Sequence, residues 1–280
     1  PARRTGAGTP QSVINEGIAL IEVDDILEGG SAIHRAKMKG FYARWQCGKQ
    51  LNLRDTGSAG TLISGVRVIQ YQDYSFVWHM QEYADSKLSL IEAPRGFLSN
   101  TEELDDSWMN KVVSSNGQIG WLGSNGRPDC AAGHSIIASE YKNKSPQLMS
   151  MCNQVVKQCK GTIVKHRIWP IPLKELRFVA FVDSALDPKG ERHQHGWLIG
   201  FTNMYLSRNM NAPISIALWR SRKLPRKAGS PQLVETYAGS YGAADLNWVK
   251  NMFLSTCLLY TSPSPRDVEE SGVAGWGWKK

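Results

Sequence analysis

The sequence lacks any long apolar run, and no segment approaches ~18 consecutive apolar residues, the length that a transmembrane helix needs. We therefore expect no membrane span. The first residue is not methionine, and the opening PARRTGAGTPQ has no apolar core of a signal peptide. This absence predicts that residues 1–17 are the flank of a piece cut from a longer chain.

Cysteine is scarce, with five scattered along the chain at Cys47, Cys130, Cys152, Cys159 and Cys257. They form neither a CxxC motif nor a Cys/His spacing typical of zinc sites. An odd, scattered set also argues against a disulfide framework. A reducing intracellular setting fits this usage best.

Acidic residues are missing from two stretches of the chain. Residues 141–174 contain seven Lys or Arg and no acid, and WRSRKLPRK at 219–227 contains five basic residues and no acid. The formal net charge is +8. Basic stretches with interleaved tryptophan favour a polyanionic partner such as a nucleic-acid backbone. A solvated basic face explains the same composition, and composition does not decide between the two.

Hydrophobic patterns in the first part of the chain predict both strands and helices. Residues 18–27 indicate a buried strand, a turn at Asp24–Asp25 and a return strand. Residues 60–80 indicate a β-hairpin around Gln72–Asp73. Helices are expected at 31–45 with Ser31 as the N-cap, in the segment QEYADSKLSLI, and over much of 101–125 and 134–160. Trp108, Trp121 and Trp169 are interpreted as packing residues.

The pattern changes after WPIPLKE at 169–175, whose two prolines indicate a linker. We therefore predict one domain over 18–170 and a second over 171–256. In the second domain, LRFVAFVDSAL, HGWLIGFTN and APISIALWRS read as strands. A helix is expected over 230–253, with Ser230 as its cap and Pro231 in its first turn. The predicted fold class is α+β.

The tail from residue 257 begins CLLYTSPSPRD and breaks the helical pattern with a Ser/Pro cluster. It can be back-translated into a string that resembles the adapter of a common transposase-based sequencing library. The alternative is an ordinary disordered tail. We treat 257–280 as an expected artefact and leave it out of the fold prediction.

Two adjacent carboxylates, Asp24 and Asp25, follow an apolar strand, where like charges repel. Such a pair is either a solvated turn or a site at which a cation relieves the repulsion. Asp183 ends an apolar strand and Glu235 lies on a helix, and the simplest explanations are a strand-terminating acid and a solvated helix face. His193 and His195 suggest a metal, but no cysteine or third histidine stands nearby. A solvated loop is the favoured interpretation of this pair.

Several short motifs follow one another in an order that resembles the Pol polyprotein of copia-type long-terminal-repeat retrotransposons. EVDD (22–25) is similar to the YVDD polymerase motif, and FYARWQCGKQLNL and LISGVRVIQ to the segments that lead into the primer-gripping hairpin. IGWLGSNGRPDCAAGHSI (119–136) is similar to LxWLxxxTRPDIAxxVS. VDSA (182–185), APISIALWRSRKLPR and SPQLVETYAGS resemble strands and a helix of RNase H.

The resemblance implies the C-terminal part of a reverse-transcriptase palm and connection region, followed by a truncated RNase H-like mixed sheet with a helix. Both activities are phosphoryl transfers that use two Mg²⁺ ions held by carboxylates. The resemblance assigns the catalytic and metal-binding roles to Asp24, Asp25, Asp183 and Glu235. It predicts that Asp183 and Glu235 face each other across one shallow site.

The same resemblance implies contacts with the backbone of an RNA/DNA hybrid or duplex. It assigns them to Trp219, Arg220, Arg222, Lys223 and Arg226. The rest of the Pol polyprotein would lie upstream of this chain. Glu22 stands where the family has tyrosine, the strand with the first polymerase aspartate is absent, and the third RNase H acid would fall in the tail. We therefore expect an inactive fragment. A non-catalytic nucleic-acid-binding remnant and a pseudogene product are the alternatives.

Overall fold

The structure is a computed structural model that describes residues 16–22, 25–45, 48, 50–94, 96–97, 103–186, 193–225 and 228–257. Helices and small antiparallel sheets make up the fold, which confirms the α+β class. The chain divides into two compact units. The smaller unit contains the described parts of 1–47 and 250–280, and the larger unit contains those of 48–249.

The smaller unit is built on the hairpin predicted at 18–27. Strands β1 (Gly17–Glu22) and β2 (Asp25–Gly30) pair antiparallel, with Glu22 opposite Asp25. Helix α1 (Ala32–Trp45) follows, and the Ser31 hydroxyl accepts hydrogen bonds from the backbone N–H groups of Ile33 and His34. Ser31 therefore caps this helix as predicted.

The prediction that the strand from Ile18 is buried is wrong. Ile18, Leu20 and Ile21 are 44%, 59% and 62% exposed. The physical reason is that β1 and β2 form a two-stranded sheet, which has too little surface to build a core of its own. The apolar character of the strand indicated burial, but burial depends on a second layer that a local pattern does not specify.

The larger unit begins with a short 3₁₀ helix, η1 (Leu53–Ala59), and a four-stranded antiparallel sheet. The strands are β3 (Thr61–Ile63), β4 (Val66–Gln70), β5 (Phe76–His79) and β6 (His166–Ile168), in that order across the sheet. β4 and β5 form the predicted hairpin. In its turn, Asp73 accepts hydrogen bonds from the backbone N–H and the hydroxyl of Ser75. The sequence did not predict β6.

Helices form the main core of the larger unit. They are α2 (Gln81–Lys87), α3 (Asp106–Asn125), α4 (Pro128–Ser139) and α5 (Gln147–Gly161), with a 3₁₀ turn, η3 (Tyr141–Asn143), between α4 and α5. The core between them includes Ile119, Leu122, Ile137, Leu148 and Val156, each at most 1% exposed. The helical predictions for 101–125 and 134–160 are confirmed, although α4 begins earlier, at Pro128.

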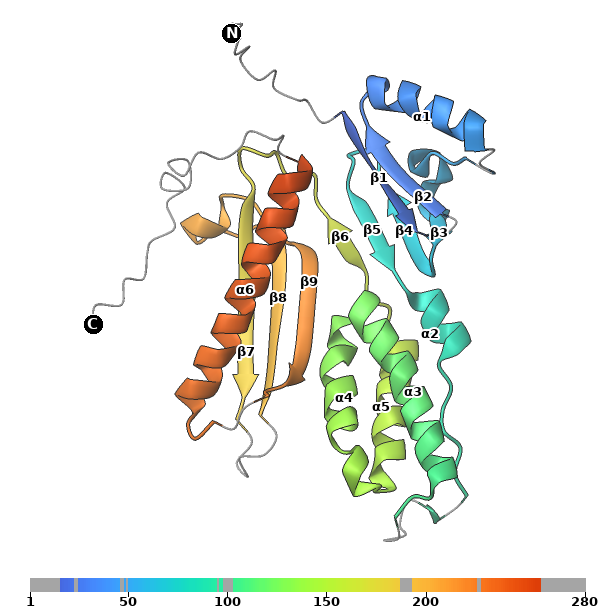
Figure 1. Cartoon of the computed structure of the whole chain (residues 1–280), viewed down its shortest axis with the longest axis vertical. Coiled ribbons are helices and arrows are strands. Elements are labelled where there is room, and N and C mark those ends of the chain that lie inside the picture. Colours follow the sequence, from blue (N-terminus) through green and yellow to red (C-terminus); the bar gives the residue numbers. More distant parts are fainter. Residues whose placement is uncertain are drawn as a thin grey trace, which may run out of the picture. The chain divides into compact units, whose positions relative to one another are not determined.

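A second sheet contains β7 (Arg177–Ala185), β8 (Gln194–Thr202) and β9 (Ser215–Lys223), and β8 is followed by a 3₁₀ turn, η4 (Leu206–Arg208). Every pairing that the structure describes in it is antiparallel, so the prediction of a mixed sheet is wrong for these residues. Helix α6 (Pro231–Cys257) runs along this sheet, and its part up to residue 249 belongs to the larger unit (Figure 1). Ser230 accepts a hydrogen bond from the Leu233 N–H, which fits its predicted capping role.

Alternate residues of β7 and β8 pack against α6. Val182 and Trp197 lie opposite each other in the sheet and share a core with Tyr241 and Val249 of the helix. Gly242 allows this close approach, because a Cβ at that position would lie 2.6 Å from Cγ2 of Val182. This packing defines a helix-covered face of the sheet and an opposite face.

Aromatic rings join the two sheets of the larger unit. Trp219 of β9 stacks on His166 of β6, with 5.4 Å between ring centroids, and His166 stacks on Trp78 of β5 at 4.3 Å. The indole N–H of Trp219 also donates to the carbonyl of Gly123 at 2.6 Å. The division predicted at residue 170 therefore falls inside this compact unit. In the part of the chain that the structure describes, no helix has the length and apolar character to cross a membrane.

Candidate nucleic-acid interface

The described part of the EVDD motif lies in the β1–β2 hairpin. Glu22 ends β1 and pairs with Asp25, which begins β2. Asp24 lies outside the described residues, and for Asp25 the backbone position is described. The hairpin geometry predicted for the motif is therefore present, and its metal-binding role stays a prediction.

Asp183 and Glu235 do not meet in one site. Val182 faces α6, and because side chains alternate along a strand, Asp183 points to the opposite face of the sheet. There it lines a shallow concavity with Gly196 and Ser221. Glu235 is exposed near the start of α6, which covers the other face. The predicted arrangement of these two carboxylates across one site is wrong.

Asp183 does not end its strand, because β7 continues to Ala185, and the interpretation of it as a strand-terminating acid is therefore wrong. Its carboxylate accepts a hydrogen bond from the backbone N–H of Ser184, the next residue along the strand. Among the described residues, no group of three or more His, Cys, Asp or Glu side chains is arranged to hold a metal ion. The described part of the chain therefore offers no assembled two-metal site.

The basic segment at 219–223 does not form one binding face, because it lies on strand β9 and its side chains alternate. Trp219 is a packing residue in the aromatic stack and not a free surface group, which corrects its predicted role. Arg220 donates to Asp245 at 3.0 Å, while Lys223 is exposed. Arg226 lies outside the described residues.

Arg222 is held over two aromatic rings of the helix-covered face. Its guanidinium carbon lies 5.1 Å from the ring centroid of Trp197 and 4.9 Å from that of Tyr241. These distances are typical of cation–π contacts, which orient the planar guanidinium group and leave its N–H edge able to bind an anion. The side chain of Arg222 is exposed, and its predicted phosphate contact stays a prediction.

Further arginines are held in the same way at the end of the four-stranded sheet. The guanidinium carbon of Arg54 lies 4.8 Å from the ring centroid of Tyr74. That of Arg167 lies 4.1 Å from Trp169 and 5.3 Å from Tyr71. We name these five residues the stacked-arginine patch. Its rings are accessible, with Tyr74 61%, Tyr71 42% and Trp169 37% exposed. Trp169 is therefore not the buried packing residue that the sequence suggested.

Hydrogen bonds to the β4–β5 turn and its neighbouring residues fix the two arginines of the patch. Arg167 donates to the Asp73 carboxylate at 3.2 Å and to the Ser75 hydroxyl at 2.9 Å, and Arg54 donates to Gln72 at 3.3 Å. The Ser75 hydrogen bonds, aided by the charge of Arg167, lower the pKa of Asp73. Sequence reasoning missed the patch because its members come from η1, the β4–β5 turn and β6. The one feature of the sequence that pointed to the patch was the basic segment 141–174, which contains Arg167 and Trp169.

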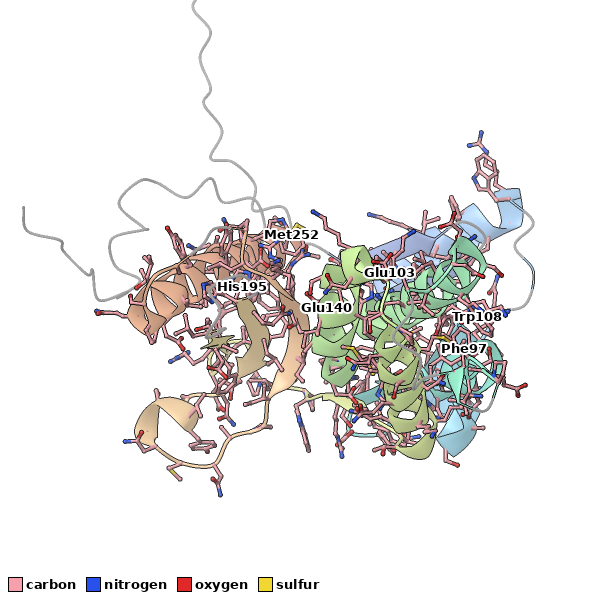
Figure 2. All side chains as sticks on the ribbon, turned by 90° about the horizontal axis from the view of Figure 1, so that it is seen from below. Phe97, Glu103, Trp108, Glu140, His195 and Met252 are labelled. Atoms are coloured by element: carbon pink, nitrogen blue, oxygen red, sulfur yellow. The ribbon has the colours of Figure 1, made fainter. Side chains whose placement is uncertain are left out.

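The two histidines of ERHQHGW are buried, so the solvated-loop interpretation is wrong. His193 is 2% exposed, and His195, on β8, is 1% exposed. Figure 2 labels His195. Its ring meets those of Trp197 and Tyr241 edge to face, each with 5.2 Å between centroids. Neither ring nitrogen of His195 has a hydrogen-bond partner among the described residues. Burial, followed by the nearby charge of Arg222, lowers the pKa of His195.

The GRPD motif, the most specific part of the resemblance, has a structural role. Arg127 is 2% exposed and forms a two-bond ion pair with Asp129, at 2.9 and 2.8 Å. It also donates to the carbonyls of Cys159 and Thr162 at the end of α5. Burial acts to raise the pKa of Asp129, but the hydrogen bonds and charge of Arg127 outweigh it and the pKa is lowered. The motif ties the start of α4 to the end of α5.

No protein-family model matches the chain, and neither does any curated protein or solved structure with which it was compared.

Proposed function

We propose that the chain is a fragment of a copia-type retrotransposon Pol protein that binds the backbone of an RNA/DNA hybrid or duplex without catalysing its hydrolysis or extension. The observation that carries the proposal is the stacked-arginine patch. Its guanidinium groups rest on exposed aromatic rings, and this geometry presents cationic donors to phosphate groups at a low cost in side-chain entropy. The ordered motifs at 22–25, 119–136 and 182–185 support the Pol origin.

The net charge of +8 supports the same partner, because a basic protein attracts polyanions over long distances. The antiparallel strands β7–β9 followed by α6 are compatible with part of an RNase H-like domain, and the β1–β2 hairpin is compatible with part of a palm. Both assignments remain parts of the proposal. The separation of Asp183 from Glu235 favours the non-catalytic form of it.

The test is the salt dependence of binding, measured by fluorescence anisotropy on labelled hybrid and duplex at several KCl concentrations. Each phosphate that is neutralised contributes about 0.9 to the slope of log affinity against log salt. The double variant Arg54→Ala, Arg167→Ala should bind more weakly and lose about 2 from that slope. The matched control is Arg208→Ala with Lys111→Ala, which removes the same charge outside the patch and should change the slope less.

An equal loss of slope in both double variants would contradict the patch and indicate a general charge effect. Binding that does not change with salt would contradict the proposal as a whole. The same preparations, given Mg²⁺ with a hybrid or a primed template, should neither cleave the hybrid nor extend the primer. Cleavage abolished by Asp183→Asn would overturn the non-catalytic assignment.

A further inference from the structure

Two buried cysteines contact each other inside the helical core. Sγ of Cys130, in the first turn of α4, lies 2.9 Å from Sγ of Cys159, near the end of α5. Cys130 is 1% exposed and Cys159 is 0% exposed. They are 29 residues apart in the sequence, so no local spacing motif predicts the contact.

The contact is held from both sides by the Arg127 network. Arg127 precedes α4, and its guanidinium group donates to the carbonyl of Cys159 at 2.9 Å. Asp129, next to Cys130, accepts hydrogen bonds from Arg127 and from Gln158, the residue before Cys159. Each cysteine therefore has a sequence neighbour that is fixed to the opposite helix. These hydrogen bonds hold the start of α4, which carries Cys130, beside the end of α5, which carries Cys159.

We propose that Cys130 and Cys159 are an oxidation site that forms an intramolecular disulfide between α4 and α5, with a hydroperoxide as the oxidant. A disulfide has an S–S length of about 2.05 Å, so the sulfur atoms need to move closer by less than about 1 Å. The site is independent of the nucleic-acid patch.

The chemistry balances with hydrogen peroxide. The Cys159 thiolate attacks one peroxide oxygen, the O–O bond breaks, and the leaving hydroxide takes a proton to become water. The resulting sulfenic acid is attacked by the Cys130 sulfur, which forms the S–S bond and releases a second water. In sum, two thiols lose two protons and two electrons, and one peroxide takes them up to become two water molecules.

The surroundings favour Cys159 as the attacking sulfur. The hydrogen bond from Cys130, with help from the charge of Arg127, lowers the pKa of Cys159 against the effect of burial. The same hydrogen bond and burial raise the pKa of Cys130. Cys152, two turns earlier on α5, offers a comparison: burial raises its pKa to about 11, and its sulfur lies near the carbonyl of Val112.

The test uses the full chain with Cys47→Ser and Cys257→Ser, so that three cysteines remain. The folded protein is treated with hydrogen peroxide, quenched and denatured, and its free thiols are counted by alkylation and mass spectrometry. We expect two of the three thiols to be lost, with a mass decrease of two hydrogens and a cross-linked peptide pair that contains Cys130 and Cys159. The melting temperature should rise after oxidation and return after reduction, because a cross-link restricts the unfolded chain.

Matched variants separate this pair from general oxidation. Cys152→Ala should leave the cross-link intact, whereas Cys130→Ala and Cys159→Ala should each abolish it. If one of these variants does not fold, the peptide map of the three-cysteine parent decides by itself. A parent that keeps all three free thiols, gains oxygen without a cross-link, or links through Cys152 would overturn the proposal.

Discussion

Arg127 is a charged side chain that is almost fully buried. Its contribution to stability depends on each of its hydrogen bonds. Its guanidinium group binds the Asp129 carboxylate and two backbone carbonyls at the end of α5. Removal of one partner from such a network leaves an uncompensated buried charge, which costs about 3–5 kcal/mol. The presence of Arg127 in the GRPD motif is thus explained by its contribution to the stability of the fold.

Arg127→Met should therefore lower the free energy of unfolding by about 3 kcal/mol or more, measured by urea denaturation at pH 7. Arg127→Lys should lose less, because it keeps the charge but not the two-bond geometry. The control is Arg220→Met, which removes the more exposed Arg220–Asp245 pair and should cost less than about 1 kcal/mol. Equal losses for Arg127→Met and Arg220→Met would show that the buried network has no special weight.

His195 makes stability depend on pH. Burial lowers its pKa, so below its ordinary value of 6.5 the folded chain binds fewer protons than the unfolded chain at this residue. The stability that neutral His195 contributes is fully present above pH 6.5, and it is lost as the pH falls through the lower pKa of the folded state. The groups that face it are Arg222 of β9, Ser184 of β7 and Tyr241 of α6. None of them carries a negative charge that would stabilise a protonated ring.

His195→Phe should therefore reduce the loss of unfolding free energy between pH 7.5 and pH 5.5, as followed by urea titrations at each pH. Part of the loss should remain, because burial also lowers the pKa of His166. Tyr241→Phe keeps the histidine and an aromatic neighbour, so its pH dependence should match that of the parent. The prediction fails if His195→Phe and Tyr241→Phe show the same loss.

At the scale of elements, β6 and β9 connect the two sheets of the larger unit. The connection is made by stacked rings from β5, β6 and β9 and by the bond from Trp219 to Gly123 at the end of α3. Strand β6 has three residues, which is too short for an alternating pattern to be recognised. Its existence depends on β5, which offers it a free edge.

Trp219→Ala should destabilise the larger unit by about 2–3 kcal/mol, which is somewhat less than for a fully buried tryptophan because this ring is half-buried. Loss of near-UV circular dichroism and a lower urea midpoint would report it. Trp121→Ala, at a residue that is 54% exposed, should stay within about 0.5 kcal/mol of the parent. If Trp219→Ala does not change the stability, Trp219 is not a packing residue and its predicted role as a surface contact would be restored.

At the scale of the whole molecule, the chain combines a small hairpin unit with a larger unit that holds the helical core and two sheets. Basic residues are spread over the sequence. The stacked-arginine patch brings together residues from three separate segments of the larger unit. The same unit contains the Cys130–Cys159 contact, within the core below α4. The proposed binding patch and the proposed oxidation site therefore lie in different parts of one compact unit.

Local features were determined by the sequence alone. Ser31 and Ser230 begin helices, Asp73 closes the β4–β5 turn, and the alternating apolar residues of β7 and β8 form strands. Each depends on interactions between residues close in the chain, such as capping bonds, turn bonds and side-chain periodicity. The α+β class and the basic character follow from the same information.

Tertiary structure decided which of these residues meet. Asp183 and Glu235 both lie where the sequence put them, on a strand and a helix, but the packing of Val182 on α6 turns Asp183 to the other face. Ile18 is exposed because β1 and β2 form a two-stranded sheet with too little surface for a core, and Trp219 is used for packing because β6 lies beside it. Contacts between distant residues depend on which faces of two elements pack together, and one strand's periodicity is compatible with either face.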